Sequence, residues 1–228
     1  MCTLREFPDQ ATLTAALAQD VIRRLKEELS RQARAVLVVS GGRSPIPLFQ
    51  ALARQVLPWE RVTVTLADER WVPPDHPDSN EALVRTHLLK GPAAAAQLVP
   101  LWSEAESPEA AAPIASAALA GLPHPFSHVL LGMGEDGHIA SLFPGAEPDP
   151  SRLAAPVPPP DASPRVARLT LTPRVLNAAR EILFLVLGAD KHPALRRILA
   201  GDGSLPAARI DARPQSWYLC PALNDNTP

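Results

Sequence analysis

Apolar positions along this chain alternate between a helical period and short continuous runs. From residue 11 to residue 34, apolar side chains recur at helical spacing between Leu13 and Leu29, as in an amphipathic helix that packs on one face. Residues 35–39 (AVLVV) follow as an apolar, β-branched run that is typical of a parallel strand covered on both sides. The pattern predicts a long helix and then a buried strand. The remaining face of that helix carries the charged residues Arg23, Arg24, Lys26, Glu27 and Glu28.

The same alternation continues to the end of the chain. Pro45 suits a first helical turn, and Ser79 suits an N-cap. Strands that alternate with helices predict an α/β fold with a mainly parallel, twisted, Rossmann-like sheet and helices on both faces. Ligands of such folds bind at the carboxyl ends of the strands. The predicted strands are 62–67, 98–101, 127–131, 168–171, 181–187 and 217–219; the predicted helices are 45–55, 80–89, 107–120, 172–179 and 191–199; residues 68–79 are predicted to be a long loop.

Composition and charge indicate an ordinary globular protein. The chain has 228 residues, of which 46% are hydrophobic and 20% charged, and we expect one domain spanning residues 1–228. No basic stripe indicates a nucleic-acid partner, and no apolar run approaches the length of about 18 residues that a membrane span needs. The first residues lack a basic segment followed by an apolar core, so we expect a cytoplasmic protein. Cys2 and Cys220 have neither disulfide-framework nor zinc-site spacing.

A glycine-rich segment, residues 132–145 (GMGEDGHIASLFPG), directly follows a predicted strand. Its first glycines therefore fall where strands of an open α/β sheet end, and Asp136 and His138 are expected to face the crevice there. Histidine, with an unperturbed pKa of about 6.5, can act as a base at neutral pH, and a neighbouring acid can orient the imidazole or the substrate. A single histidine is more often structural, but this context favours a catalytic one.

The glycines of this segment also match a dinucleotide-binding fingerprint, which would indicate a dehydrogenase. That fingerprint requires a full helix after the third glycine and an acidic residue at the end of the next strand. Pro144 stops any helix soon after His138, and the proline-rich residues 156–161 cannot form an interior strand. The sequence therefore disfavours a nicotinamide cofactor.

Residues 40–44 (SGGRS) join a predicted strand to a predicted helix. Small residues at this place allow backbone N–H groups and a hydroxyl to converge on an anion such as a phosphate. A plain tight turn is an equally good interpretation of the glycines alone. The segment lacks the Gly-Lys-Ser/Thr of a nucleotide-binding P-loop, so ATP hydrolysis is not expected.

Two further cations follow predicted strands. Arg70 lies in the charged segment 68–73 (DERWVP), and Lys191 lies just after the strand 181–187. Both can reach a bound phosphate at the same sheet edge, although a local ion pair for Arg70 and a solvated position for Lys191 are the simpler alternatives. His124 and His128 are four residues apart, but Pro125 between them argues against a helical pair of metal ligands.

Taken together, these segments resemble the 6-phosphogluconolactonase family of the glucosamine-6-phosphate isomerase superfamily, over nearly the whole chain. The resemblance rests on these motifs: 40–45 (SGGRSP), 68–73 with the Ser-Asn pair 79–80, the long segment 132–145, 168–170 (RLT) and 188–191 (GADK). The long segment is highly specific, and the others are individually modest. Ser44 replaces a more usual threonine, and Ile139 stands where threonine is common.

The resemblance implies hydrolysis of 6-phospho-D-glucono-1,5-lactone to 6-phospho-D-gluconate in the oxidative pentose phosphate pathway, without a metal or other cofactor. It implies that His138 is the general base, that Asp136 helps to position it, and that Arg70 and Lys191 hold the phosphate. We expect a monomer or a weak homodimer whose partner is the phosphosugar lactone. The predicted substrate-binding residues are Ser40, Gly41, Gly42, Arg43, Ser44, Asp68, Arg70, Arg168 and Lys191.

Two rival functions share features of this sequence. Glucosamine-6-phosphate deaminase shares the Asp-Gly-His-Ile-Ala segment, but there it continues to a catalytic glutamate, whose place is taken here by Phe143. A silent phosphosugar sensor is disfavoured because Asp136 and His138 are both present and no helix-turn-helix precedes Ala35. Whether Asp136 orients His138 or binds a sugar hydroxyl stays open, as do the roles of the remaining candidates: Arg43, Arg165, Arg168 and His192.

Overall fold

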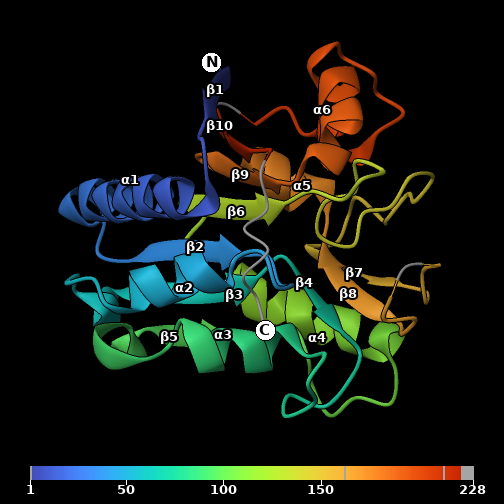
Figure 1. Cartoon of the computed structure of the whole chain (residues 1–228). Coiled ribbons are helices and arrows are strands. Elements are labelled where there is room, and N and C mark those ends of the chain that lie inside the picture. Colours follow the sequence, from blue (N-terminus) through green and yellow to red (C-terminus); the bar gives the residue numbers. More distant parts are fainter. Residues whose placement is uncertain (1, 162, 213, 222–228) are drawn as a thin grey trace.

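The computed structural model describes residues 2–161, 163–212 and 214–221 (Figure 1). Its helices are α1 (Gln10–Arg31), α2 (Ile46–Ala53), α3 (Asn80–His87), α4 (Pro108–Ala120), α5 (Pro173–Ala178) and α6 (His192–Leu199). Its strands are β1 (Cys2–Glu6), β2 (Ala35–Val39), β3 (Val62–Leu66), β4 (Asp68–Arg70), β5 (Gln97–Val99), β6 (His128–Gly132), β7 (Ala154–Val157), β8 (Arg168–Leu171), β9 (Ile182–Leu187) and β10 (Gln215–Cys220).

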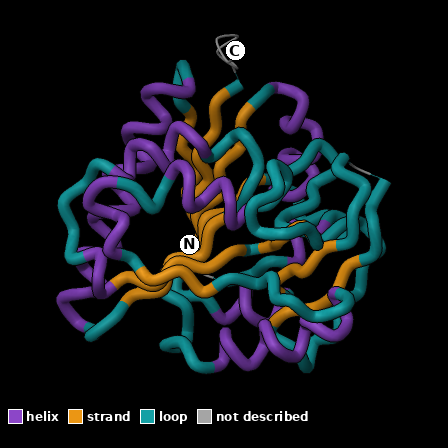
Figure 2. The backbone as a smooth tube through the Cα atoms, turned by 90° about the horizontal axis from the view of Figure 1, so that it is seen from below, coloured by secondary structure: helices purple, strands orange, loops and turns teal. Residues whose placement is uncertain are grey.

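Seven strands form one parallel sheet in the order β1-β10-β9-β6-β2-β3-β5, which confirms the predicted mainly parallel α/β fold. Figure 2 shows helices on either side of these strands. Because β2 and β9 are buried along their whole length, they are continuous apolar runs in the sequence. No helix in the described part of the chain is long and apolar enough to cross a membrane.

A second, three-stranded antiparallel sheet, in the order β4-β8-β7, corrects the prediction of a continuous loop over residues 68–79. Asp68 pairs with Thr170 and Arg70 pairs with Arg168, so the first three residues of the predicted loop are a strand. Because these residues are charged, the strand does not appear in the sequence as an apolar run. The central strand is β8, and β7 lies at the edge, where Pro156 is tolerated because the strand pairs on one side only.

Some boundaries also differ from the prediction. The strand expected at 98–101 is Gln97–Val99, and β1, which was not predicted, pairs in parallel with β10 at the sheet edge. The charged face of α1 is not uniformly solvated. Arg24 Nε donates to Glu181 Oε2 over 2.6 Å, and Glu28 pairs with Arg180, because this part of α1 packs against other elements.

His128 gives the fold a measurable pH dependence. Burial within β6 lowers the pKa of this histidine, although the carboxylates of Glu181 and Glu28 act in the opposite direction. The folded protein therefore protonates this ring at a lower pH than the unfolded chain, which takes up a proton as the pH falls below about 6.5. The stability that depends on this ring is complete above that pH and is lost as the pH falls.

We expect the free energy of unfolding to lose up to about 1.4 kcal/mol per pH unit from this group below about pH 6.5. In His128→Leu this contribution is expected to be absent. Urea denaturation of both proteins from about pH 5 to about pH 8 measures it, because the difference between the two curves cancels the other titrating groups. Parallel curves for the two proteins would contradict this account.

Candidate active site

A cavity of about 500 Å³ opens at the carboxyl ends of β2, β6 and β9 and beside β4. Glu135 and Asp190, which the sequence analysis did not single out, also line it; their only signal is that each precedes a predicted site residue. Arg43 is exposed and is not among the lining residues, so its role stays a prediction. Arg165 and His192, whose roles were left open, do not line the crevice either. Every other residue predicted to act in catalysis or substrate binding lines it: Ser40, Gly41, Gly42, Ser44, Asp68, Arg70, Asp136, His138, Arg168 and Lys191.

His138 and Asp136 form a short hydrogen bond in the crevice. His138 Nδ1 lies 2.6 Å from Asp136 Oδ1, which also accepts the backbone N–H of His138 over 3.1 Å. Because an ionised carboxylate can only accept, Nδ1 carries the proton and Nε2 holds the lone pair. The geometry thus presents a basic imidazole nitrogen, with a carboxylate behind it, to whatever occupies the crevice.

Two glycines make room for this pair. A Cβ atom on Gly134 would lie 2.2 Å from the His138 ring, which is far closer than real Cβ contacts. Gly137, between Asp136 and His138, has φ +75°, a conformation that residues with a side chain rarely adopt. Gly134 therefore serves the close approach of the histidine side chain and Gly137 serves the turn, so a dinucleotide is not needed to explain either glycine.

Phe143 packs against both the base and a buried cation. Its ring centroid lies 4.7 Å from that of His138, and the guanidinium carbon of Arg168 lies 5.5 Å from it on the ring face. Aromatic rings attract cations over such distances. Phe143 thus packs against two residues of the crevice without carrying a proton-transferring group.

The glycine loop lies directly against Asn80, the first residue of α3. A Cβ atom on Gly41 would come 1.7 Å from the side-chain oxygen of Asn80. Asn80 Nδ2 in turn donates to the backbone oxygen of Asp68 over 2.8 Å and to its carboxylate over 3.2 Å. Sequence analysis recorded Asn80 only as part of a Ser-Asn pair; its supporting contact with the loop depends on tertiary packing.

Glu69 holds the start of α3 against β4. Its carboxylate accepts the backbone N–H groups of Arg70, Asn80 and Glu81, each over 2.7 Å, and the hydroxyl of Ser79 over 3.1 Å. Burial raises the pKa of Glu69 to about 7, whereas these backbone hydrogen bonds lower it. The carboxylate accepts hydrogen bonds from backbone N–H groups that have no partner within α3. Its role is therefore to hold α3 in place beside the crevice.

Three cations face the crevice: Arg70, Arg168 and Lys191. Arg70 is held by its hydrogen bond to the backbone oxygen of Asp78 over 2.7 Å. Burial lowers the pKa of Arg168, and Asp68, whose carboxylate lies 3.9 Å from it, opposes that effect. Lys191 ends a short 3₁₀ segment, Ala189–Lys191, that follows β9. Cations from three different segments thus converge on one crevice, which favours an anionic ligand.

His124 and His128, the pair considered as metal ligands, lie outside the crevice. His124 Nε2 lies 3.0 Å from the backbone oxygen of Leu119, and His128 is buried in β6. Among the residues that the structure describes, no group of three or more histidine, cysteine, aspartate or glutamate side chains is arranged to hold a metal ion.

Comparison with known proteins adds independent evidence. A family model described as glucosamine-6-phosphate isomerases/6-phosphogluconolactonase matches residues 8–219. A Pseudomonas putida protein named 6-phosphogluconolactonase is 42% identical over 227 residues, covering 96% of this chain and 93% of that protein. A Pseudomonas aeruginosa protein of the same name is 44% identical over 226 residues, with 94% of each covered. The crystal structure of a 6-phosphogluconolactonase from Shewanella baltica superposes with a TM-score of 0.91 at 33% identity, covering 97% and 98% of the two chains.

Proposed function

The chain belongs to the family of glucosamine-6-phosphate isomerases and 6-phosphogluconolactonases and is a lactone-hydrolysing enzyme, and from this we propose that it converts 6-phospho-D-glucono-1,5-lactone to 6-phospho-D-gluconate. In this proposal residues 1–228 act as one domain in the oxidative pentose phosphate pathway. The observation that carries it is the combination, in one crevice, of an imidazole oriented by a carboxylate with three cations.

His138 is the general base in the proposed reaction. Its Nε2 takes a proton from water while the water oxygen attacks the lactone carbonyl, and Asp136 stabilises the imidazolium that forms. When the tetrahedral intermediate collapses, the bond from the carbonyl carbon to the ring oxygen breaks, and the imidazolium returns its proton to that oxygen. The products are the open-chain acid and the original neutral histidine. A lactone is already an activated ester, so a base worth about 10²–10⁴-fold, together with positioning, is a sufficient mechanism.

The phosphate is bound, in this proposal, by Arg70 and Lys191, with the backbone and hydroxyl of the loop from Gly41 to Ser44 close by. Arg168, buried beside Asp68, adds positive charge behind the sugar. The arrangement fixes the substrate by the end that does not react, so that the carbonyl is presented to the base.

The rival deaminase reaction needs a further acid–base residue after the shared segment. Phe143 stands there, and its ring packs against the imidazole of His138. Lactone hydrolysis, which requires one base and a water molecule, is therefore the function that these side chains support best.

The direct test is hydrolysis of freshly generated 6-phosphoglucono-δ-lactone at mildly acidic pH, where the spontaneous reaction is slow. Proton release is followed with and without enzyme, and unphosphorylated glucono-δ-lactone is the matched control. We expect rapid turnover of the phosphorylated lactone and weak turnover of the control, because only the former engages the cations. Rates equal to the uncatalysed background with both lactones would refute the proposed function.

A further inference from the structure

The segment that follows His138 adopts an unusual backbone conformation. Ala140 has φ +50°, a left-handed conformation that residues other than glycine rarely adopt, and Leu142 N–H donates to the Ile139 oxygen over 2.9 Å to close the turn. Such conformations persist when the surrounding structure holds them in place. The turn joins His138 at one end to Phe143, which packs on the imidazole, at the other. Whatever holds the turn therefore also holds the base.

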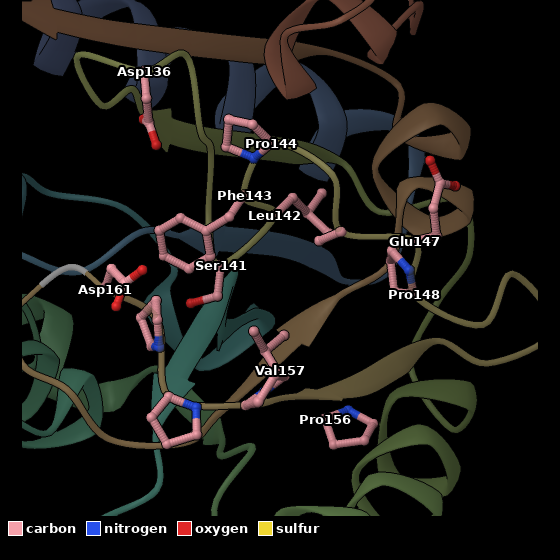
Figure 3. Close-up of a pocket in the computed structure, with 14 residues that line it drawn as sticks. Asp136, Ser141, Leu142, Phe143, Pro144, Glu147, Pro148, Pro156, Val157 and Asp161 are labelled. Carbon is pink, nitrogen blue, oxygen red and sulfur yellow. The ribbon is translucent and has the colours of Figure 1, made fainter.

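Apolar packing holds only part of this turn, through Ile139 and Leu142, which are buried in the core. Behind it lies a second cavity, of about 670 Å³, lined by Leu142, Phe143 and Pro144 and by the proline-rich residues 156–161 (Figure 3). Asp136 lines both this cavity and the crevice. The segment from Leu142 to Pro144 thus borders an open space, and polar contacts add to the apolar packing in locating it.

Ser141 supplies those contacts. It is fully buried, its backbone N–H donates to Thr170 Oγ1 over 3.2 Å, and its hydroxyl donates to Asp68 Oδ2 over 2.6 Å. Arg168 also donates to the Ser141 hydroxyl over 3.4 Å. One small residue therefore ties the turn to two strands of the antiparallel sheet, β4 through Asp68 and β8 through Thr170.

The contact extends to the glycine loop. The carboxylate of Asp68 accepts from Asn80, and Asn80 lies against Gly41. Without the Ser141 hydroxyl, Asp68 Oδ2 would lose its short hydrogen bond and keep Arg168 at 3.9 Å. A buried carboxylate oxygen that loses a donor favours local rearrangement. The structure thus links the base, the buried arginine and the loop through one hydroxyl.

We propose that Ser141 is a positioning residue, which fixes His138 relative to the residues that bind the substrate. The expected loss of kcat rests on the proposed lactonase function, whereas the expected displacement of His138 does not. Ser141 does not touch the substrate or transfer a proton; it acts through the turn and through Asp68.

The test uses three variants of the full chain. Ser141→Ala removes the hydroxyl, Thr170→Val removes the acceptor of the Ser141 N–H while keeping the side-chain shape, and Thr170→Ser keeps that acceptor. Ser127→Ala is the matched control, because Ser127 is a buried serine whose hydroxyl accepts the Val36 N–H over 3.0 Å at the opposite end of β6. Thermal unfolding and binding of inorganic phosphate check that each variant is folded.

We expect kcat for the phosphorylated lactone to fall about 10- to 100-fold in Ser141→Ala and in Thr170→Val. This is the loss expected when a catalytic base is displaced by up to about 1 Å. KM and phosphate affinity should change less than kcat, and Thr170→Ser and Ser127→Ala should stay near wild type. Unchanged kcat in folded Ser141→Ala would overturn the proposal.

A second readout does not depend on lactone hydrolysis. The imidazole resonances of His138, identified by their loss in His138→Gln, should shift in Ser141→Ala and stay unchanged in Ser127→Ala. Unshifted resonances in Ser141→Ala would overturn the positioning role. If the resonances shift while the wild-type protein lacks lactonase activity, the positioning role stands and the proposed function fails.

Discussion

His138→Gln is expected to lower kcat for 6-phosphoglucono-δ-lactone by about 10²–10⁴-fold, the contribution that a positioned general base makes. Glutamine keeps a polar side chain of comparable length beside Asp136 but has no basic nitrogen to accept the proton of water. Because the cations are untouched, binding of inorganic phosphate should stay close to that of the wild type. The loss should therefore fall on kcat and much less on KM.

Steady-state proton release with purified wild type and variant measures this effect. His124→Gln is the matched control, since His124 is an exposed histidine outside the crevice, and its replacement should leave kcat unchanged. Loss of phosphate binding in His138→Gln would indicate a disturbed crevice rather than a missing base. A variant that is folded and retains wild-type kcat would remove His138 from the mechanism.

Lys191→Gln is expected to weaken use of the phosphorylated lactone, lowering kcat/KM by roughly 10- to 150-fold, the worth of one hydrogen bond to a charged group. Hydrolysis of unphosphorylated glucono-δ-lactone, already slow, should not change, because this substrate offers no phosphate to Lys191. The ratio of the two kcat/KM values therefore reports the phosphate contact alone. Arg70→Gln should act in the same direction, with an added structural effect because Arg70 also binds the Asp78 oxygen.

Lys26→Gln provides the control for net charge. Lys26 is exposed on α1, away from the crevice, and its replacement changes the charge of the protein by the same amount. Its kcat/KM values should match those of the wild type at equal ionic strength. An equal loss for both lactones in Lys191→Gln would argue that Lys191 supports the crevice without binding the phosphate.

The helices and most strands of the parallel sheet could be predicted from sequence because they depend on local patterns, whereas β1, β4 and β7 were missed. Buried parallel strands such as β2 and β9 are continuous apolar runs, and α1 has a clear apolar face. The place of the crevice followed from the same patterns, since glycine-rich segments at strand ends meet at one edge of a parallel sheet. The pairing of β4 with β8 did not follow, because its members are far apart in sequence and one of them is highly charged.

The supporting contacts of the site lay beyond sequence analysis for the same reason. Ser141 is one small residue in a long motif, and its value lies in Asp68 and Thr170, which come from two other segments. Likewise, Arg24 lies on the charged face of α1, yet it pairs with Glu181 from a distant segment. Such partners are chosen by packing across the sheet and leave no local periodic signal.

The sequence by itself determined the fold class, the motifs and the identity of the side chains capable of chemistry, because periodicity, glycine positions and titratable groups are local properties of the chain. Only the tertiary structure decided which of these side chains share one crevice, which atom of His138 faces Asp136, and how the turn at Ala140 is held. The shared crevice and the anchoring of the turn depend on contacts between segments distant in the chain, such as Ser141 with Asp68. The orientation of His138 depends on a near neighbour, but on a geometry that periodicity and residue type do not specify.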